Sequence, residues 1–335
     1  MNAAALAWRI ASTGISSRWN TFVILMLVAL LGMPAHAQDF PNRPIGVVVP
    51  FAAGGPSDVI ARILTEHMSR TLRQPMIIEN VPGAGGTTGV ARAAKAARDG
   101  YTILLGHMGT HAAAVGLYPN LPYDPLTDFS AIGLTAGTPV LILGKKDLAP
   151  RTLKEFITYI TANSSKMNQA HGGVGSISHL SCVLLNSILR VDPVTIPFSG
   201  SGPALNALVG GQVDYLCGAS GVSQVTAGVI KAYAITTAQR NPVLPDVPTT
   251  AESGLPEFEV SAWNGLFAPR GTPSGTVSTL ADALDKALDD PAVRKRLLDL
   301  ASDIPTKDRR GPQFLDAYVK REVERWAPIA RSMKH

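Results

Sequence analysis

The chain has 335 residues, of which 16% are charged and 6% are aromatic, and its formal net charge is +5 at pH 7. The positive charges are scattered apart from short clusters such as Arg294–Arg296, and the aromatic residues are sparse. The composition therefore indicates neither a nucleic-acid footprint nor a base-stacking platform, and the length suits two lobes rather than one core.

The first 37 residues have the pattern of a secretory signal. Arg9 and Arg18 supply positive charge, Thr21–Met33 is a short apolar run, and Ala35–Ala37 forms a small-x-small cleavage site. We therefore predict export and cleavage after Ala37. An uncleaved anchor is the alternative, although the apolar run is short for a bilayer span.

The stretch after the signal that organises the chain is a buried strand, a glycine turn and a helix start. Val47–Val49 lacks polar alternation, as expected for a strand covered on both faces. Gly54 and Gly55 permit a tight turn, Pro56 suits the first helical position with Gly55 as N-cap, and Asp58 lies in the first turn. The free N–H groups of such a turn predict a site for a small carboxylate or phosphate. The alternative is a plain strand-to-helix connection.

Two more strands and a second glycine loop follow. Residues 76–80 form a predicted strand, and the loop 81–89 leads into a helix over 90–97, with Thr88 where a dinucleotide fingerprint requires glycine. The next strand, 101–106, is followed by Gly109-Thr110-His111. This order predicts a parallel sheet with its ligand beyond the carboxyl ends of the strands. His111 could act as a general base, but a hydrogen-bonding histidine is the more ordinary interpretation.

The middle of the chain repeats this arrangement. Strands are predicted over 129–134 and 139–143, and 144–147 is a plausible hinge into a second lobe. The glycine-and-hydroxyl loop 171–179 opens a helix for which Ser176 or Ser178 is a candidate N-cap. A nucleophilic serine is the alternative, but Ile177-Ser178 breaks the Gly-x-Ser-x-Gly pattern of a nucleophile elbow.

The rest of the chain closes the second lobe and returns to the first. Further strands are predicted over 194–196, 212–220, 231–236 and 260–267, and a small-residue loop over 197–203 contains Ser201. Amphipathic helices are predicted over 277–288, 292–300 and 314–329. The predicted division is a signal over 1–37, a first lobe over 38–143 and 250–335, and a second lobe over 144–249.

Two cysteines, Cys182 and Cys217, lie in the exported part of the chain. One disulfide fits an exported protein with an even, low cysteine count. Two buried free thiols are the alternative, because spacing alone does not bring the two residues within reach. The cysteines do not have metal-ligand spacing, and we predict no metal or other cofactor.

Short motifs in serial order across nearly the whole exported chain resemble the extracytoplasmic receptors of the tripartite tricarboxylate transporter family, the Bug or TctC-like proteins. No single motif identifies the family, but the serial order of the motifs does. The matching segments are Arg43-Pro44-Ile45, Pro50–Gly55 with Asp58 and Arg62, Gly83–Gly86, Asp99–Thr102, Leu121–Asp124, Gly175–His179, Gly210–Asp214 and Pro245–Thr249.

This resemblance implies a two-lobed α/β fold of the type II periplasmic-binding-protein kind, in which each lobe is a mainly parallel sheet flanked by helices and crossover strands join the lobes. It implies a non-enzymatic, monomeric periplasmic receptor that captures a small organic acid for membrane transporter subunits. Some relatives carry cysteine at both positions, which favours the disulfide. The expected ligand-binding residues are Phe51, Ala53, Gly54, Gly55, Ser57, Asp58, Thr110, His111, Ser176, Ser178, His179 and Ser201.

The chain departs from the family pattern in two places. Many relatives have a Tyr-Lys/Arg-Gly segment where this chain has Phe198-Ser199-Gly200, and several have Asp-Gln where it has Gly218-Ala219. These departures indicate a difference from those relatives at the distal end of the ligand. Two alternative functions are a ligand-dependent partner of a membrane sensor and an exported hydrolase using Ser176 or Ser178 with His179 or His111.

Overall fold

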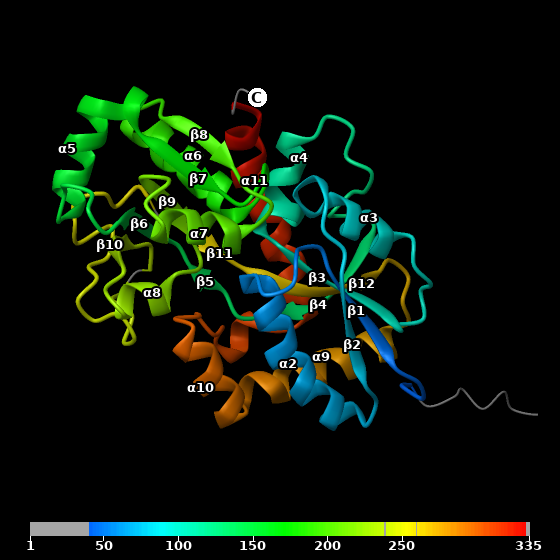
Figure 1. Ribbon diagram of the computed structural model, residues 1–335. Helices are drawn as coiled ribbons and strands as arrows, with labels where there is room; N and C mark the ends of the chain where they lie inside the picture. The colour runs from blue at the N-terminus through cyan, green and yellow to red at the C-terminus, as the bar shows by residue number, and fades with distance from the viewer. Residues whose placement is uncertain (1–39, 238, 259, 333–335) are drawn as a thin grey trace, which may run out of the picture. The chain divides into compact units, whose positions relative to one another are not determined.

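The computed structural model describes residues 40–332 except 238 and 259, so the predicted signal and its cleavage site lie outside the described residues. Two five-stranded sheets form the framework (Figure 1). The first sheet has the order β2-β1-β3-β12-β4, in which β1 and its two neighbours are parallel and β12 is antiparallel to both of its neighbours. Its strands are β1 (Ile45–Val49), β2 (Met76–Asn80), β3 (Thr102–His107), β4 (Phe129–Leu134) and β12 (Asn264–Pro269).

The second sheet has the order β10-β6-β9-β7-β8. Strand β7 is parallel to β8 and β9, whereas β6 is antiparallel to β9 and β10. Its strands are β6 (Leu141–Lys145), β7 (Asn168–His171), β8 (Val194–Pro197), β9 (Tyr215–Gly218) and β10 (Ile230–Ile235). We call the elements packed on the first sheet the first lobe and those on the second sheet the second lobe.

In each sheet four strands run in one direction and one runs against them, β12 in the first and β6 in the second, so the prediction of mainly parallel sheets is confirmed. Two of the four pairings in each sheet are antiparallel. The physical reason is that β12 and β6 enter their sheets from the other lobe, so they arrive against the direction set by the local strand-helix-strand units. Local sequence order predicts only those units.

The chain passes between the sheets twice, in β5 (Thr138–Pro139) and β11 (Ser261–Ala262), which pair antiparallel. The predicted two-lobed α/β fold with crossover strands is therefore confirmed. The predicted boundary between residues 143 and 144 falls inside β6, which belongs to the second sheet, and the return to the first sheet occurs at β11 rather than at residue 250.

Helices cover both faces of each sheet, as alternating strand residues require. In β1, Val47 and Val49 pack with α2, α9 and α10, whereas Val48 faces the core that contains α3, α4 and α11. On the second sheet, α5 and α6 share a core with Tyr215, and α7 and α8 pack on the other face. The longer helices are α2 (Pro56–Leu72), α3 (Thr87–Ala94), α5 (Leu153–Asn163), α6 (Ile177–Leu189), α7 (Ser201–Val209), α9 (Ser274–Asp289), α10 (Pro291–Asp299) and α11 (Pro312–Ser332), and the shorter ones are α4 (Ala114–Leu117) and α8 (Val222–Thr226).

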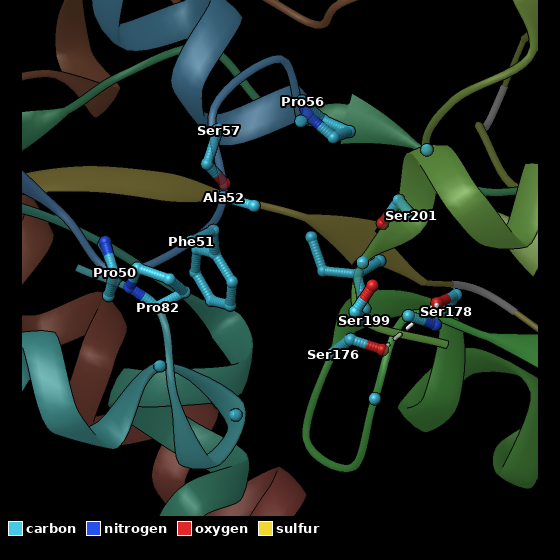
Figure 2. Close-up of a pocket in the computed structure, with 18 of the residues that line it drawn as sticks. Pro50, Phe51, Ala52, Pro56, Ser57, Pro82, Ser176, Ser178, Ser199 and Ser201 are labelled. Carbon is cyan, nitrogen blue, oxygen red and sulfur yellow. Dashed lines mark hydrogen bonds between the residues drawn. The ribbon is translucent and has the colours of Figure 1, made fainter. Parts of the chain in front are cut away.

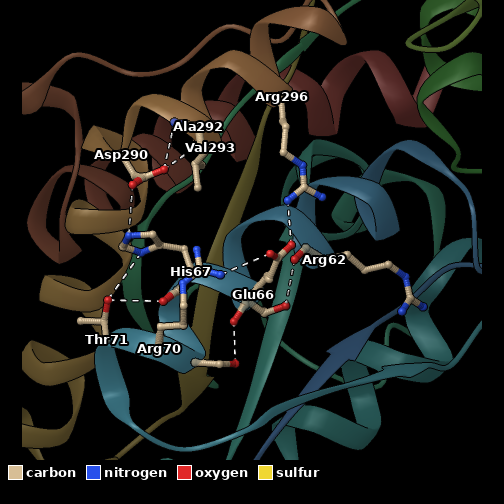
Figure 3. A network of polar contacts seen from close by, with 11 residues as sticks. Arg62, Glu66, His67, Arg70, Thr71, Asp290, Ala292, Val293 and Arg296 are labelled. Carbon is tan, nitrogen blue, oxygen red and sulfur yellow. Dashed lines mark hydrogen bonds and ion pairs between the residues drawn. The ribbon is translucent and has the colours of Figure 1, made fainter.

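Polar contacts on the surface tie α2 to α10 (Figure 3). Glu66 accepts hydrogen bonds from Arg70 and Arg296. His67 Nε2 lies 3.6 Å from Asp290 Oδ2, and the carboxylate of Asp290 also caps α10. The hydrogen bond from Arg296 lowers the pKa of Glu66, with Arg70 adding to the effect. Exposed ion pairs of this kind contribute little free energy each, but together they orient α2.

The two cysteines are free buried thiols in the structure, so the predicted disulfide is not formed there. Strand β9 and helix α6 pack so that the main-chain N–H of Cys217 donates to Sγ of Cys182 at 3.0 Å. Burial raises the pKa of the Cys217 thiol, and the neighbouring Cys182 adds to the rise. Over the described part of the chain there is no helix with the length and apolar character of a membrane span, and no cluster of His, Cys, Asp and Glu suited to a metal.

The C-terminal helix α11 is held to the first sheet by a buried hydrogen bond. The indole N–H of Trp263, between β11 and β12, donates to Glu322 Oε2 at 2.8 Å, and both side chains are buried. Trp263 also breaks the single strand predicted over 260–267 into β11 and β12.

We predict that Glu322→Ala lowers the free energy of unfolding by about 1–3 kcal/mol, because the buried indole N–H loses its acceptor. Urea denaturation followed by circular dichroism measures the change. Glu324→Ala, at an exposed position of the same helix, is the matched control and should stay within about 0.5 kcal/mol of the parent protein. Equal effects of the two substitutions would contradict the assigned role of Glu322.

Candidate functional site

A cavity of about 300 Å³ lies between the loops of the two lobes (Figure 2). First-lobe loops that follow β1 and β2 line one side, together with His107 at the end of β3. Second-lobe loops that follow β7, β8 and β9 line the other side. The cavity therefore lies at the carboxyl ends of six strands, where ligands bind in open α/β sheets.

Among the described residues that line this cavity there is no Lys, Arg, Asp or Glu, and the one ordinary titratable side chain there is that of His107. The polar groups of the lining are main-chain amides and the hydroxyls of five serines, Ser57, Ser176, Ser178, Ser199 and Ser201 (Figure 2). A negatively charged ligand would be held by neutral dipoles rather than by a cationic side chain.

Helix N-termini from both lobes reach this cavity. From the first lobe, α2 begins at Pro56 after the N-cap Gly55, as the sequence predicts, and α3 follows the 3₁₀ turn η1 (Ala84–Gly86). From the second lobe, α6 begins after the N-cap Ser176 and α7 begins at Ser201. The first turns of all four helices, or the residues just before them, line the cavity. Helix N-termini present free N–H groups and the positive end of the helix dipole, so the cavity is suited to anions.

Of the twelve predicted ligand-binding residues, eight line the cavity and four lie behind it. The lining set is Phe51, Ala53, Gly54, Gly55, Ser57, Ser176, Ser178 and Ser201. The other four are Asp58, Thr110, His111 and His179. Asp58, Thr110 and His179 form hydrogen bonds with the lining residues Gly54, His107 and Ser176, whereas His111 contacts Thr110.

Asp58 is buried behind the first loop and holds its shape. Its carboxylate accepts hydrogen bonds from Gly54 N–H at 2.8 Å, Arg62 Nε at 2.9 Å and Asn80 Nδ2 at 2.9 Å, and Asn80 Nδ2 also donates to Phe51 O. Burial alone would raise the pKa of Asp58, but the bonds from Arg62, Gly54 and Asn80 together lower it. The residue is therefore an ionised anchor for the loop.

The histidine of this region that lines the cavity is His107. The sequence pattern predicts a role for Gly109-Thr110-His111 and gives none to His107. His107 Nδ1 accepts the N–H of Gly109 at 2.7 Å, and its ring stacks on Phe51 with the centroids 4.4 Å apart. Burial lowers the pKa of His107 to about 4, so the imidazole is neutral at physiological pH. His107 is the last residue of β3, and this position at the carboxyl end of a strand could have identified it as a site residue.

His111 belongs to the core of the first lobe. It is fully buried, its ring stacks on Phe267 with the centroids 4.1 Å apart, and its Nδ1 lies 3.0 Å from Thr110 Oγ1. Burial lowers the pKa of His111 to about 3, and His107 adds to the shift. This placement gives the side chain a packing role.

In the second lobe, the serines of loop 171–179 are engaged in capping. Ser176 Oγ accepts the N–H of His179 at 3.2 Å, and Ser178 Oγ accepts the N–H of Gly172 at 2.9 Å. The two hydroxyls lie 3.1 Å apart, and His179 Nδ1 accepts the N–H of Gly175 at 3.3 Å. These contacts order the N-terminus of α6 and turn the loop toward the cavity.

Ser57 links the first loop to the crossover region. Its hydroxyl donates to Asn264 Oδ1 at 3.0 Å, and Asn264 Nδ2 donates to Ala136 O at 3.2 Å. Asn264 begins β12 just after β11, and Ala136 precedes β5, so one amide side chain contacts the binding loop and the bases of both crossovers.

The two lobes approach each other closely through glycines at one rim of the cavity. A Cβ added to Gly109 would lie 2.4 Å from Gly175 O, and one added to Gly85 would lie 2.5 Å from Val174 O. Gly85 also has a φ of +63°, in a run of positive φ values over 83–86 that includes Ala84. Only glycine allows this backbone contact between the lobes.

A sequence model of the tripartite tricarboxylate transporter family receptor, TctC, matches residues 60–334. Protein BugT of Bordetella pertussis is 32% identical over 311 residues, which cover 92% of this chain and 94% of BugT. The chain belongs to the TctC family. The family resemblance inferred from the sequence motifs is thereby confirmed.

Solved structures of receptors resemble this TctC protein over most of its length. MatC (Rpa3494) from Rhodopseudomonas palustris, described with bound malate, is 50% identical, with a TM-score of 0.83 and coverage of 87% of this chain and all of MatC. R. palustris Rpa4515, described with adipate, is 31% identical, with a TM-score of 0.82 and coverage of 88% and 98%. These likenesses confirm the fold class.

We predict that Asp58→Ala weakens the binding of an organic acid at least tenfold while the fold is retained, because Gly54, Asn80 and Arg62 lose their shared acceptor. Isothermal titration calorimetry measures affinity, and circular dichroism checks the fold. Asp58→Asn keeps the shape of the side chain and one acceptor oxygen, so this variant should lose less ligand affinity than Asp58→Ala. Unchanged affinity in Asp58→Ala would remove the residue from the support of the site.

A second prediction concerns acid stability. His107 and His111 have folded-state pKa values of about 4 and about 3, below the ordinary value of 6.5. The unfolded chain therefore takes up protons first as the pH falls, and the stability present above about pH 6.5 is progressively lost toward pH 4. As the pH falls from 7 to 5, each histidine should lower the free energy of unfolding by up to about 2 kcal/mol.

Urea denaturation at both pH values measures this loss, and His111→Phe, which keeps the stacking on Phe267, should lose less stability than the parent protein over the same interval. An identical pH dependence in the parent and the variant would show that His111 is not buried in its neutral form.

Proposed function

We propose that this TctC-family protein is a periplasmic solute-binding receptor that captures a small dicarboxylate between its lobes and presents it to the membrane subunits of a tripartite tricarboxylate transporter. Family membership supports the transporter role. The structural relatives described with malate and adipate support the ligand class, since both of those acids carry two carboxylates. Export through cleavage after Ala37 and action as a monomer are parts of the same proposal.

The observation that carries this proposal is the meeting of helix N-termini from both lobes at a cavity without a formally charged lining residue. In the proposal, α2 and α3 hold one carboxylate through main-chain N–H groups, and α6 and α7 hold the other. One carboxylate per lobe makes the ligand a bridge, so a dicarboxylate gains contacts in the closed form that a monocarboxylate lacks.

Capture follows from this geometry. The ligand enters an open form, binds the loops of one lobe, and shifts the equilibrium toward the closed form through the contacts that only closure provides. The crossovers β5 and β11 are the proposed hinge, and the glycine contact at the cavity rim, with Gly109 against Gly175, is the proposed closed-state contact. The eight predicted residues that line the cavity are the proposed direct contacts, and the other four support them.

The protein is proposed to bind its ligand without transforming it. The hydroxyl of Ser176 accepts the N–H of His179 in the first turn of α6, that of Ser178 accepts the N–H of Gly172 after β7, and His111 is buried in the first-lobe core. These contacts support roles in capping and packing for the residues that the hydrolase alternative would use.

We predict that malate and adipate bind at least tenfold more tightly than monocarboxylates of the same length, as measured by isothermal titration calorimetry. Ser201→Asp places a negative charge at the α7 end of the cavity, so it should weaken dicarboxylate binding at least tenfold by repulsion. Ser201→Asn, with nearly the same shape and no charge, is the matched control.

Ser201→Asp should leave monocarboxylate affinity within about threefold of the parent, because a single carboxylate binds the first-lobe loops alone. Equal affinities for mono- and dicarboxylates in the parent protein would contradict the two-lobe bridge. Proton NMR of the acids incubated with the protein should show no new species with time, and the accumulation of a product would overturn the receptor function itself.

A further inference from the structure

A second cavity, of about 290 Å³, adjoins the first on the side of the crossovers. Its walls come from the first turns of α2, from Thr138 in β5, from α7, from the start of α8, and from the end of α10 with the residues after it. Both lobes and a crossover strand thus enclose it. Neither the family match nor the described ligands of the relatives assign a role to this space.

The two cavities meet at small residues. Gly54, Pro56 and Ala219 line both of them. A Cβ added to Gly54 would meet no atom within 4 Å, so the space beside this residue is open, and Ala219 presents a single methyl group from the opposite lobe. The two cavities are therefore neighbours that share a border of small residues.

The chemistry of the second cavity differs from that of the first. One formally charged residue lines it, the exposed Asp299, whose carboxylate is paired with Lys295 Nζ at 2.8 Å. An anionic group would thus find no positive partner in this lining and one negative neighbour. Most of the wall is hydrocarbon, from Val59, Ile60, Leu205, Val222 and Leu300. The cavity is suited to an apolar group.

One buried polar group in the wall is unsatisfied. Ser302 is 2% exposed, and its hydroxyl has no hydrogen-bond partner in the part of the chain that the structure describes. A buried hydroxyl without a partner costs free energy, which a ligand atom able to donate or accept a hydrogen bond would recover. The second cavity therefore combines mainly apolar walls with neutral polar side chains, of which Ser302 is the buried one without a partner among the described residues.

We propose that the second cavity is a subsite for an apolar substituent of the ligand, so that the preferred ligand is an alkyl- or aryl-substituted dicarboxylate. Its two carboxylates occupy the first cavity, and its side group passes between Pro56 and Ala219 into the second. A side group that ends in a hydroxyl gains a hydrogen bond to Ser302. This inference rests on the proposed dicarboxylate function and specifies the substrate class within it.

The test is isothermal titration calorimetry of the exported chain with succinate, 2-methylsuccinate, 2-butylsuccinate and 2-phenylsuccinate. Each methylene that enters the subsite should tighten Kd by about threefold. Val222→Phe fills the subsite from α8, so it should remove the gain from the butyl group and leave the affinity for succinate within about twofold. Val229→Phe, the same change at an exposed valine outside this lining, is the matched control and should retain the gain.

Ser302→Ala provides a second test, because this substitution leaves the subsite unfilled. It should weaken a 2-(4-hydroxybutyl)succinate several-fold and leave 2-butylsuccinate unchanged, because only the hydroxyl of the former reaches Ser302. Thermal melting of each variant establishes folding, and the series on the parent protein decides the proposal if a variant does not fold.

Tight binding of succinate with no gain, or a loss, from the substituents would overturn the subsite and leave the receptor function standing. A gain that survives Val222→Phe would also overturn it, because the side group would then lie elsewhere. Failure of every acid in the series to bind would overturn the dicarboxylate function and the subsite with it.

Discussion

The fixed orientation of main-chain N–H groups is the constraint on which the candidate site depends. A lysine or arginine can follow an anion by changing its rotamer, but a main-chain dipole is useful only where the backbone holds it. Much of the structure near the cavity serves that end. The buried carboxylate of Asp58 holds the Gly54 turn and Asn80, Ser176 caps α6, and the polar contacts of Glu66 and His67 tie α2 to α10.

The local units of the fold were predictable from the sequence because their signals are local. A run of β-branched residues followed by Gly54, Gly55 and Pro56 predicts a strand, a turn and a helix start, and the structure has all three at the expected residues. The small-residue loops at 171–179 and 197–203 were predicted in the same way, and both line the cavity. Their shared position at the carboxyl ends of the strands follows from the strand-helix order.

The remaining features depend on tertiary contacts that no local pattern carries. The antiparallel entry of β12 and β6 arises from crossovers between distant segments. Asp58 has the sequence position of a ligand contact, yet Arg62 and Asn80 draw its carboxylate behind the loop. His107 and His111 are four residues apart in the sequence. His107 stacks on Phe51 at the cavity, whereas His111 stacks on Phe267 in the core. The second cavity likewise combines segments from α2, β5, α8 and α10.

The amide of Asn264 has a mechanical consequence for any bending of the molecule. One side chain joins the hydroxyl of Ser57 to the carbonyl of Ala136, at the root of both connecting strands. In the proposed closure about β5 and β11, these two hydrogen bonds fasten the α2 loop to the hinge itself, so the second-lobe loops are the part that moves relative to it. The proposal thus assigns the ligand's first contacts to a loop that keeps its place beside the hinge.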